Sequence, residues 1–333
     1  MNTIAIDGPQ KPINSIIDLF KFFASFLVVS IHAQPFYGGS ADYYYNCFSV
    51  SAVPFFFCVS SYLFFLKESS SIKKYLKRIL LLYLVWFIIE LPLVFMRFSQ
   101  YPTIEGSVMS FIKGFFLQNT FYASWFLMAS CEALLLVYLL QKYTSVIFCS
   151  IVCVGFYIVG LFASMWGGVI QFLPNGELIV SVLKMICASQ SFIVAIPYVF
   201  IGMIVARNKN ILNKHNYALL LICVFLLGAY EAVIAKPYSM GKTVSLCMPW
   251  FIYILLRYLL SIHITLSKDV SLYIRKTSIL IYLIHPVVIL CLQHIFNMTL
   301  GWTLYIITLS TSIVLAFTIV GLSGRIRILR YLY

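Results

Sequence analysis

The chain has 333 residues, of which 62% are hydrophobic and 10% are charged, and its mean hydropathy is +0.98. An average globular chain is roughly 25% charged, and so few polar side chains cannot cover a water-facing surface. These values exclude a soluble enzyme, a disordered chain and a small disulfide scaffold. The sequence is that of an integral membrane protein.

The net charge is +13, from 23 Lys and Arg against 10 Asp and Glu. In a soluble domain this excess suggests nucleic-acid binding, but here the basic residues separate apolar runs, so we expect no nucleic-acid partner. The nine cysteines lie mostly inside apolar runs and form no C-x-x-C pair. Such cysteines are typical of small buried hydrophobic residues rather than of metal ligands or disulfides. We therefore expect no metal.

A membrane-spanning helix needs about 20 mostly apolar residues. With this criterion the sequence predicts an all-α polytopic membrane helix bundle of about ten transmembrane helices, in which the sixth span is short enough to be re-entrant. The predicted spans are Ile16–Ala33, Cys47–Leu66, Ile79–Met96, Phe121–Leu140, Ser145–Met165, Ser191–Ala206, Tyr217–Ala235, Val244–Ile262, Ser278–Phe296 and Trp302–Leu322. The longest predicted connections are the outer loops 97–120 and 166–190.

The distribution of basic residues predicts the orientation of the bundle. If the N-terminus is cytoplasmic, 17 basic residues lie inside and 5 lie outside. The five outside residues are Arg97, Lys113, Lys184, Lys236 and Lys242. Because basic flanks resist translocation, we expect both termini in the cytoplasm of a bacterial cell, with the chain in its inner (plasma) membrane. We expect a single domain over 1–333: a cytoplasmic segment 1–14, a transmembrane bundle 15–323 and a cytoplasmic tail 324–333.

Ionisable side chains inside the spans are the first candidates for function, since each costs ~2.5–3.5 kcal/mol on insertion scales. They are Asp18, Lys21, His32, Glu90, Glu132, Glu231 and His285. Lys21 and His32 are eleven positions apart, so they share one helix face about 16 Å apart, and Asp18 shares that face too. Two plainer interpretations stay open: Lys21 snorkels or only pairs with Asp18, and His32 is a hydrogen-bonding core residue.

Four stretches follow one another in a recognisable order. They are IDLFK at 17–21, with His32 after ten further residues; VPFFFCVSSYLF at 53–64; WFL at 125–127; and SILIYLIHPVVI at 278–289. Together they resemble the motifs of the acyltransferase 3 family of membrane-bound acyltransferases. The chain departs from the family pattern at three positions: Ser61 replaces the usual Gly, Ala123 stands where many relatives have His, and Lys21 replaces the commoner Arg.

The resemblance implies a membrane O-acyltransferase, and most often an O-acetyltransferase. Such an enzyme moves an acyl group from a cytoplasmic acyl-CoA, here acetyl-CoA, to a hydroxyl of a cell-surface polysaccharide or of its lipid-linked saccharide precursor. The partners expected are therefore acyl-CoA, this glycan acceptor and the lipid bilayer. The residues assigned to coenzyme binding are Lys21, Asp18, Lys73, Lys74 and Arg78.

The proposed chemistry makes His32 a general base that deprotonates the acceptor hydroxyl, since imidazole is suited to proton transfer near neutral pH. An acyl-histidine intermediate is the less economical route. His285 is assigned to the same site, where it orients His32 or holds the coenzyme. Trp125, Glu132 and Tyr282 are assigned to substrate binding, and Glu132 is expected above all to pair with Lys21.

Two other functions remain open at this stage. Buried charges and Pro-interrupted helices are equally natural in a transporter-like membrane protein for a small polar solute such as an amino acid. A structural partner within a glycan assembly complex would show no turnover at all. Accumulation of labelled solute in vesicles and acceptor-dependent release of coenzyme A distinguish these possibilities.

Overall fold

A computed structural model describes residues 15–67, 71–98, 103–116, 124–186, 191–208 and 212–333. These residues form helices and no strand. The α-helices are α1 (Ile16–Ala33), α2 (Asp42–Ser49), α3 (Ala52–Phe65), α4 (Ile72–Phe98), α5 (Ile104–Phe116), α6 (Trp125–Tyr143), α7 (Val146–Phe162), α8 (Gly176–Met185), α9 (Phe192–Arg207), α10 (Lys214–Ala235), α11 (Met248–Ser261), α12 (Lys268–Phe296) and α13 (Trp302–Leu322). Three 3-10 helices are η1 (Gly167–Phe172), η2 (Lys236–Tyr238) and η3 (Arg327–Leu332).

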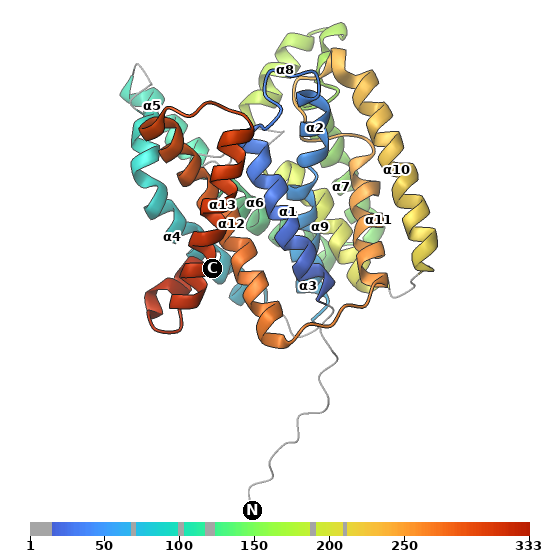
Figure 1. The fold of residues 1–333 in the computed structure, drawn as a ribbon. Coiled ribbons are helices and arrows are strands. Elements are labelled where there is room, and N and C mark those ends of the chain that lie inside the picture. Colours follow the sequence, from blue (N-terminus) through green and yellow to red (C-terminus); the bar gives the residue numbers. More distant parts are fainter. Residues whose placement is uncertain (1–14, 68–70, 99–102, 117–123, 187–190, 209–211) are drawn as a thin grey trace, which may run out of the picture.

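The helices form one bundle in which α4 and α5 lie at one edge and α10 at the other (Figure 1). Within the described chain, six helical stretches are long and apolar enough to cross a membrane, and α7, α9 and α11 are shorter apolar helices. Nine of the ten predicted spans each overlap one helix of the bundle, and the second overlaps α2 and α3. The prediction of a polytopic helical membrane protein is confirmed.

Helix α9 occupies the interior of the bundle, where it packs against α3, α6 and α7. Its 16 residues form one continuous helix that is buried along most of its length. A helix of this length spans about 24 Å, less than the roughly 30 Å of a bilayer core. Because protein rather than lipid surrounds it, the shorter length exposes no backbone to hydrocarbon.

The contact between α3 and α9 is close because small residues lie between the two backbones. A Cβ atom at Gly202 would collide with the carbonyl oxygen of Cys58. Ser61 donates a 2.6 Å hydrogen bond from its Oγ to the carbonyl of Val199. Thus the serine that replaces the usual glycine of the family motif still permits a close approach.

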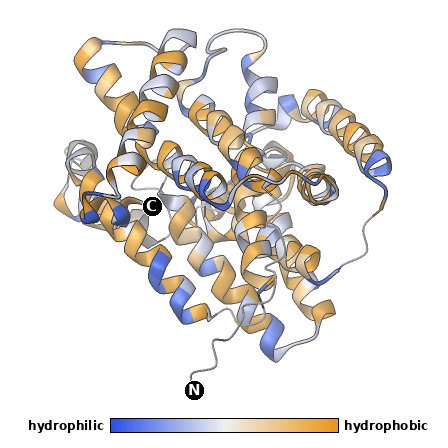
Figure 2. Cartoon of the chain, turned by 60° about the horizontal axis from the view of Figure 1, so that its bottom comes forward, coloured by the Kyte–Doolittle hydropathy of each residue, from blue (hydrophilic) through white to orange (hydrophobic). Residues whose placement is uncertain are grey.

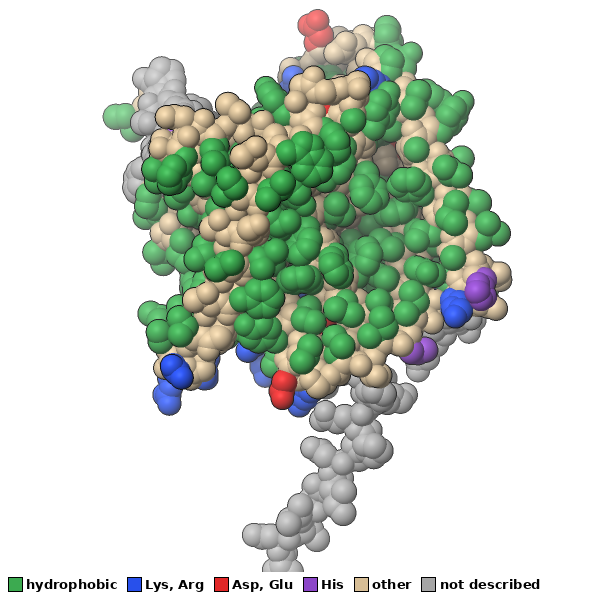
Figure 3. Space-filling model, in the orientation of Figure 1, with side chains coloured by type: hydrophobic (Ala, Val, Ile, Leu, Met, Phe, Trp, Pro, Cys, Tyr) green, Lys and Arg blue, Asp and Glu red, His purple; other side chains and the backbone are tan. Residues whose placement is uncertain are grey.

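The two ends of the bundle differ in charge. Hydrophobic side chains cover most of the visible face, and Lys and Arg side chains gather mainly along its lower edge (Figure 3). The view that brings this end forward shows hydrophilic residues at helix ends and hydrophobic residues along the helices (Figure 2). This asymmetry agrees with the positive-inside pattern used to orient the chain.

Three features of the backbone differ from the prediction. The second predicted span is two helices, α2 and α3, because Pro54 has no N–H to donate to the preceding turn. The two long outer connections contain α5, η1 and α8 and so are largely helical. The predicted tail folds back as η3, where the indole of Trp86 donates to the carbonyl of Leu332 over 3.0 Å.

Candidate active site

A cavity of about 520 Å³ lies at the end of the bundle where α1 and α12 begin, between α1, α3, α4, α6 and α12. Its described lining contains five cationic residues and no acidic one. The five are Lys21, Lys67, Lys74, Arg78 and Arg275. Lys21 is 7% exposed, whereas Lys67, Lys74 and Arg78 are exposed at the rim. The cavity is therefore a positively charged site that opens at the basic end of the protein.

Asp18 lies beside this cavity and holds one of its cations in place. Its carboxylate accepts hydrogen bonds from Nε of Arg275 at 2.9 Å and from Nη2 at 2.8 Å. The Oγ of Ser271 donates a third bond of 2.6 Å. These bonds fasten α1 to α12, and the two-pronged contact fixes the direction of the guanidinium. Asp18 thus acts on the cavity through Arg275 rather than by lining it.

The second polar site lies about 16 Å further along α1, where two imidazoles meet. The ring centroids of His32 and His285 are 5.1 Å apart, and the rings are tilted by 38°. Nδ1 of His285 lies 3.3 Å from the carbonyl of Ile281. Because a carbonyl can only accept, Nδ1 carries the proton, and Nε2 of a neutral ring then carries a lone pair. That Nε2 is buried and has no hydrogen-bond partner within the described chain.

Aromatic side chains lie between the two polar sites. Tyr282 lines the cavity, and its ring centroid is 6.1 Å from that of His285. Phe56 and Phe126 also line the cavity, with ring centroids 5.6 Å and 5.3 Å from that of Tyr282. The inner end of the cavity is thus an aromatic cluster that is in contact with the histidine pair.

The expected common face of α1 is confirmed. Asp18 and His32 both contact α12, and Lys21 lines the cavity together with Tyr282 of α12. Ser278 of α12 donates to the backbone carbonyl of Lys21 over 2.9 Å, so the two helices meet along this stripe. The stripe faces protein and the cavity, not lipid.

Several assigned residues lie elsewhere. Lys74 and Arg78 line the cavity, but Lys73 does not. Trp125 packs its ring on Phe57, with centroids 5.8 Å apart, and is not part of the lining. Glu132 is half-buried on α6, and neither ion pair found in the described chain includes it. The expected Glu132–Lys21 pair is wrong: Lys21 lies on the same face of α1 as Asp18, the carboxylate that acts on its charge.

Two further carboxylates inside the predicted spans, those of Glu90 and Glu231, are buried. Glu90 is 2% exposed and accepts a 2.8 Å hydrogen bond from Ser124. Glu231 accepts from the indole of Trp166 at 2.9 Å and from the backbone N–H groups of Leu246 and Cys247. Glu231 therefore joins α10 to the connection before α11, a structural role. Ala123, where relatives have a histidine, lies outside the described residues.

The sequence analysis did not assign Arg275 and Tyr333 to the site, although both line the cavity. Arg275 falls outside the ninth predicted span, Ser278–Phe296, because the hydropathy falls off before Ser278. Helical spacing could have identified Arg275, because it lies seven positions before Tyr282 and so shares one face of an extended α12 with it. Tyr333 has no comparable signal, because the folding-back of the tail brings it to the cavity.

A membrane-embedded helical bundle with a cationic cavity at one end of its first helix and paired imidazoles near the other defines a polytopic membrane protein with an internal polar site. The chain belongs to the acyltransferase 3 family, whose model, described as an acyltransferase domain, matches residues 14–321. It is thus a multi-pass membrane protein of this family. No solved structure matches the chain significantly.

The chain is also similar to part of some larger curated proteins. It is 26% identical over 296 residues to a protein named amino-acid racemase from Enterococcus faecalis, an alignment that covers 84% of this chain and 41% of the relative. It is 25% identical over 288 residues to a serine/alanine racemase from Enterococcus gallinarum, covering 82% of this chain and 40% of the relative. The chain thus spans about two fifths of the length of these relatives.

Proposed function

We propose that this protein is an O-acetyltransferase that moves an acetyl group from cytoplasmic acetyl-CoA to a hydroxyl of a cell-surface glycan or its lipid-linked saccharide precursor. The observation that carries the proposal is the cationic cavity with the histidine pair beyond its aromatic end. The acyltransferase family assignment supports the reaction class.

The cavity fits the charge of a coenzyme A thioester. The phosphates of coenzyme A are anionic, and the guanidinium and ammonium groups of Arg275, Arg78 and Lys21 are suited to bind them. Lys67 and Lys74 at the rim attract the same charge from the cytoplasm. The apolar and aromatic part of the lining suits the uncharged arm of the coenzyme, with its thioester directed toward the histidines.

His32 serves as the general base in this proposal. Its imidazole takes the proton of the acceptor hydroxyl as the oxygen attacks the thioester carbonyl; the C–S bond then breaks, and the thiolate leaves with that proton as coenzyme A. His285 is a positioning residue: its Nδ1–H is held by the Ile281 carbonyl, which fixes the ring beside His32.

The test is genetic complementation in the organism that encodes the protein. Deletion of the gene should remove an acetyl mass increment from one surface glycan, and the native gene should restore it. His32→Ala should lower acetylation ~10²–10⁴-fold, the usual contribution of a general base. The matched control is His294→Ala, because His294 is exposed at the end of α12. Full acetylation by a normally inserted His32→Ala protein would refute the assignment.

A second candidate function, movement of a small polar amino acid across the membrane, rests on the racemase-named relatives, of which this chain matches only part. A transport assay and the deletion strain distinguish the two functions. Accumulation of labelled serine in sealed vesicles, with no loss of glycan acetylation in the deletion strain, would favour transport.

A further inference from the structure

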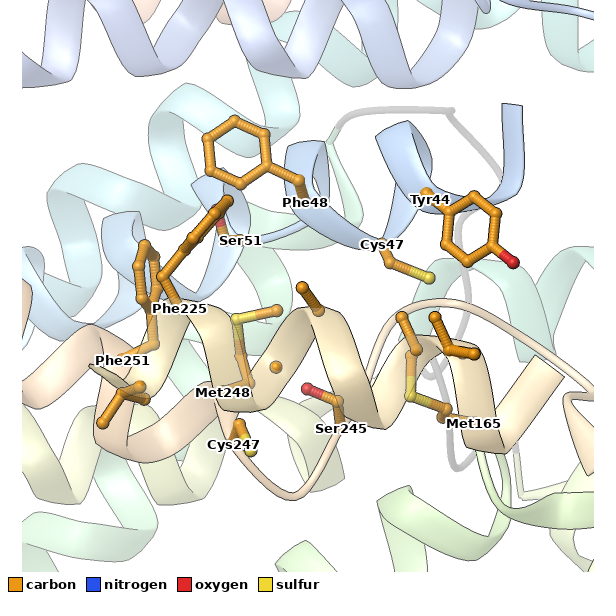
Figure 4. A pocket seen from close by; sticks show the side chains of 15 residues that line it. Tyr44, Cys47, Phe48, Ser51, Met165, Phe225, Ser245, Cys247, Met248 and Phe251 are labelled. Atoms are coloured by element: carbon orange, nitrogen blue, oxygen red, sulfur yellow. The ribbon is translucent and has the colours of Figure 1, made fainter. Parts of the chain in front are cut away.

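A second cavity, of about 430 Å³, lies on the opposite side of the bundle, between α2, α10 and α11 (Figure 4). Its walls are mostly apolar, and the sulfur-containing and aromatic side chains Met165, Met248, Phe48, Phe225 and Phe251 contribute to them. It shares no lining residue with the cationic cavity. We refer to it as the α10 groove.

The α10 groove lies beside a helix surface that faces the bilayer. On α10, Leu226 is 60% exposed and Tyr230 is 66% exposed, and Val233, which lines the groove, is 56% exposed. Large apolar side chains at this exposure on a spanning helix are in contact with lipid. The groove is therefore accessible to lipid chains.

Cations lie next to one end of the groove. Tyr44 lines it, and the Nζ atom of Lys236 lies 5.0 Å from the centroid of the Tyr44 ring and 5.7 Å from that of Tyr43. Lys242 lies 5.6 Å from the same Tyr43 ring, and Asp42 neutralises it through an ion pair of 3.0 Å. Lys236 takes part in neither of the ion pairs found within the described chain. One positive charge at this end of the groove is thus not offset by a carboxylate.

We propose that the α10 groove is a binding site for one anionic phospholipid of the outer leaflet. The groove accommodates an acyl chain, and Lys236 binds the headgroup phosphate, where Tyr43 and Tyr44 keep its ammonium in place by cation–π contacts. Lys236 and Lys242 belong to the few basic residues expected outside, and tyrosines are favoured at headgroup depth. Charge complementarity selects an anionic lipid over a zwitterionic one.

The proposal is tested on the purified full-length chain by native mass spectrometry. Delipidated protein is titrated with phosphatidylglycerol or with phosphatidylcholine of the same acyl chains. We expect one phosphatidylglycerol to bind with higher affinity than phosphatidylcholine. Equal affinity for the two lipids, or a shift to a dimer with no retained lipid, would overturn the proposal.

Variants locate the site. Lys236→Gln should weaken phosphatidylglycerol binding about fivefold, the factor expected for one lysine at an anionic surface, and Lys236→Arg should retain it. Lys184→Gln is the matched control, because Lys184 is an exposed lysine on α8 outside the groove. An equal effect of Lys236→Gln and Lys184→Gln would refute the headgroup contact.

A second pair of variants tests whether the apolar part of the α10 groove holds the acyl chain. Ala229 lines the groove and is exposed, so Ala229→Phe should fill it and displace the lipid without disturbing the core. Leu226→Phe, on the same helix but outside the lining, should bind lipid normally. Normal lipid binding by Ala229→Phe would overturn the proposal whatever the outcome of the acetylation experiments, since this inference does not depend on the transfer reaction.

Discussion

The substitution Asp18→Asn tests whether the contact between α1 and α12 holds the cationic cavity together. In the native chain the carboxylate accepts two hydrogen bonds from Arg275 and one from Ser271. The asparagine has nearly the same shape but removes the charge, and its amide nitrogen cannot accept. We expect a less stable protein with a less well oriented guanidinium, and therefore weaker binding of acetyl-CoA.

The magnitude follows from the burial of the two partners. The Asp18 side chain is 3% exposed, whereas that of Arg275 is 35% exposed. Exposed pairs contribute about 0–1 kcal/mol, and breaking a fully buried pair costs about 3–5 kcal/mol. Because water can still solvate the released Arg275, we expect a loss of about 2 kcal/mol in the free energy of unfolding, or about 30-fold in the folding equilibrium.

The assay is reversible unfolding in mixed micelles, analysed as a double-mutant cycle with Arg275→Gln. The two single variants and the double variant should give a coupling energy of about 2 kcal/mol. The control is Asp269→Asn, because Asp269 is exposed in the first turn of α12, the helix that carries Arg275. This substitution should change the free energy of unfolding by only a few tenths of a kcal/mol. A coupling below about 0.5 kcal/mol would refute the assignment of Asp18 as the residue that positions Arg275.

Three further predictions follow. Acetyl-CoA titration should show that Lys21→Arg keeps most of the affinity, Lys21→Ala loses it and Lys21→Glu is worst, since the side chain is proposed to meet phosphate; an unchanged affinity in Lys21→Ala would return this lysine to a snorkelling role. Gly202→Ala should cost about 1–3 kcal/mol of stability by overpacking α3 against α9, whereas Gly155→Ala, which meets open space, should not destabilise. In a cysteine-free background, Tyr37→Cys should react with an impermeant thiol reagent from outside and Thr265→Cys only after the membrane is opened; the reverse would overturn the topology.

Much of the fold could be predicted because a bilayer imposes a length and a polarity on every span. Each of the ten spans predicted by hydropathy falls on helical chain, and the limits of α1 at Ile16 and Ala33 agree with the prediction. The hydropathy criterion failed for segments whose helix limits are not set by the thickness of the bilayer. It joined α2 to α3, because it takes no account of the missing N–H of Pro54, and it did not find α5 and α8 in the outer connections.

The candidate site could also be predicted only in part from the sequence. The shared face of Asp18, Lys21 and His32 follows from helical periodicity within one segment, so the sequence by itself determined it. Which residues meet that face depends on the rotation and crossing of α12 against α1, and no pattern within either helix specifies these. Only the tertiary structure brought Arg275 to Asp18, and it placed the ring of His285 beside that of His32, one of the two arrangements expected for this residue. It also showed that Glu132 of α6 does not pair with Lys21 of α1, since a long-range contact is decided by how whole helices pack.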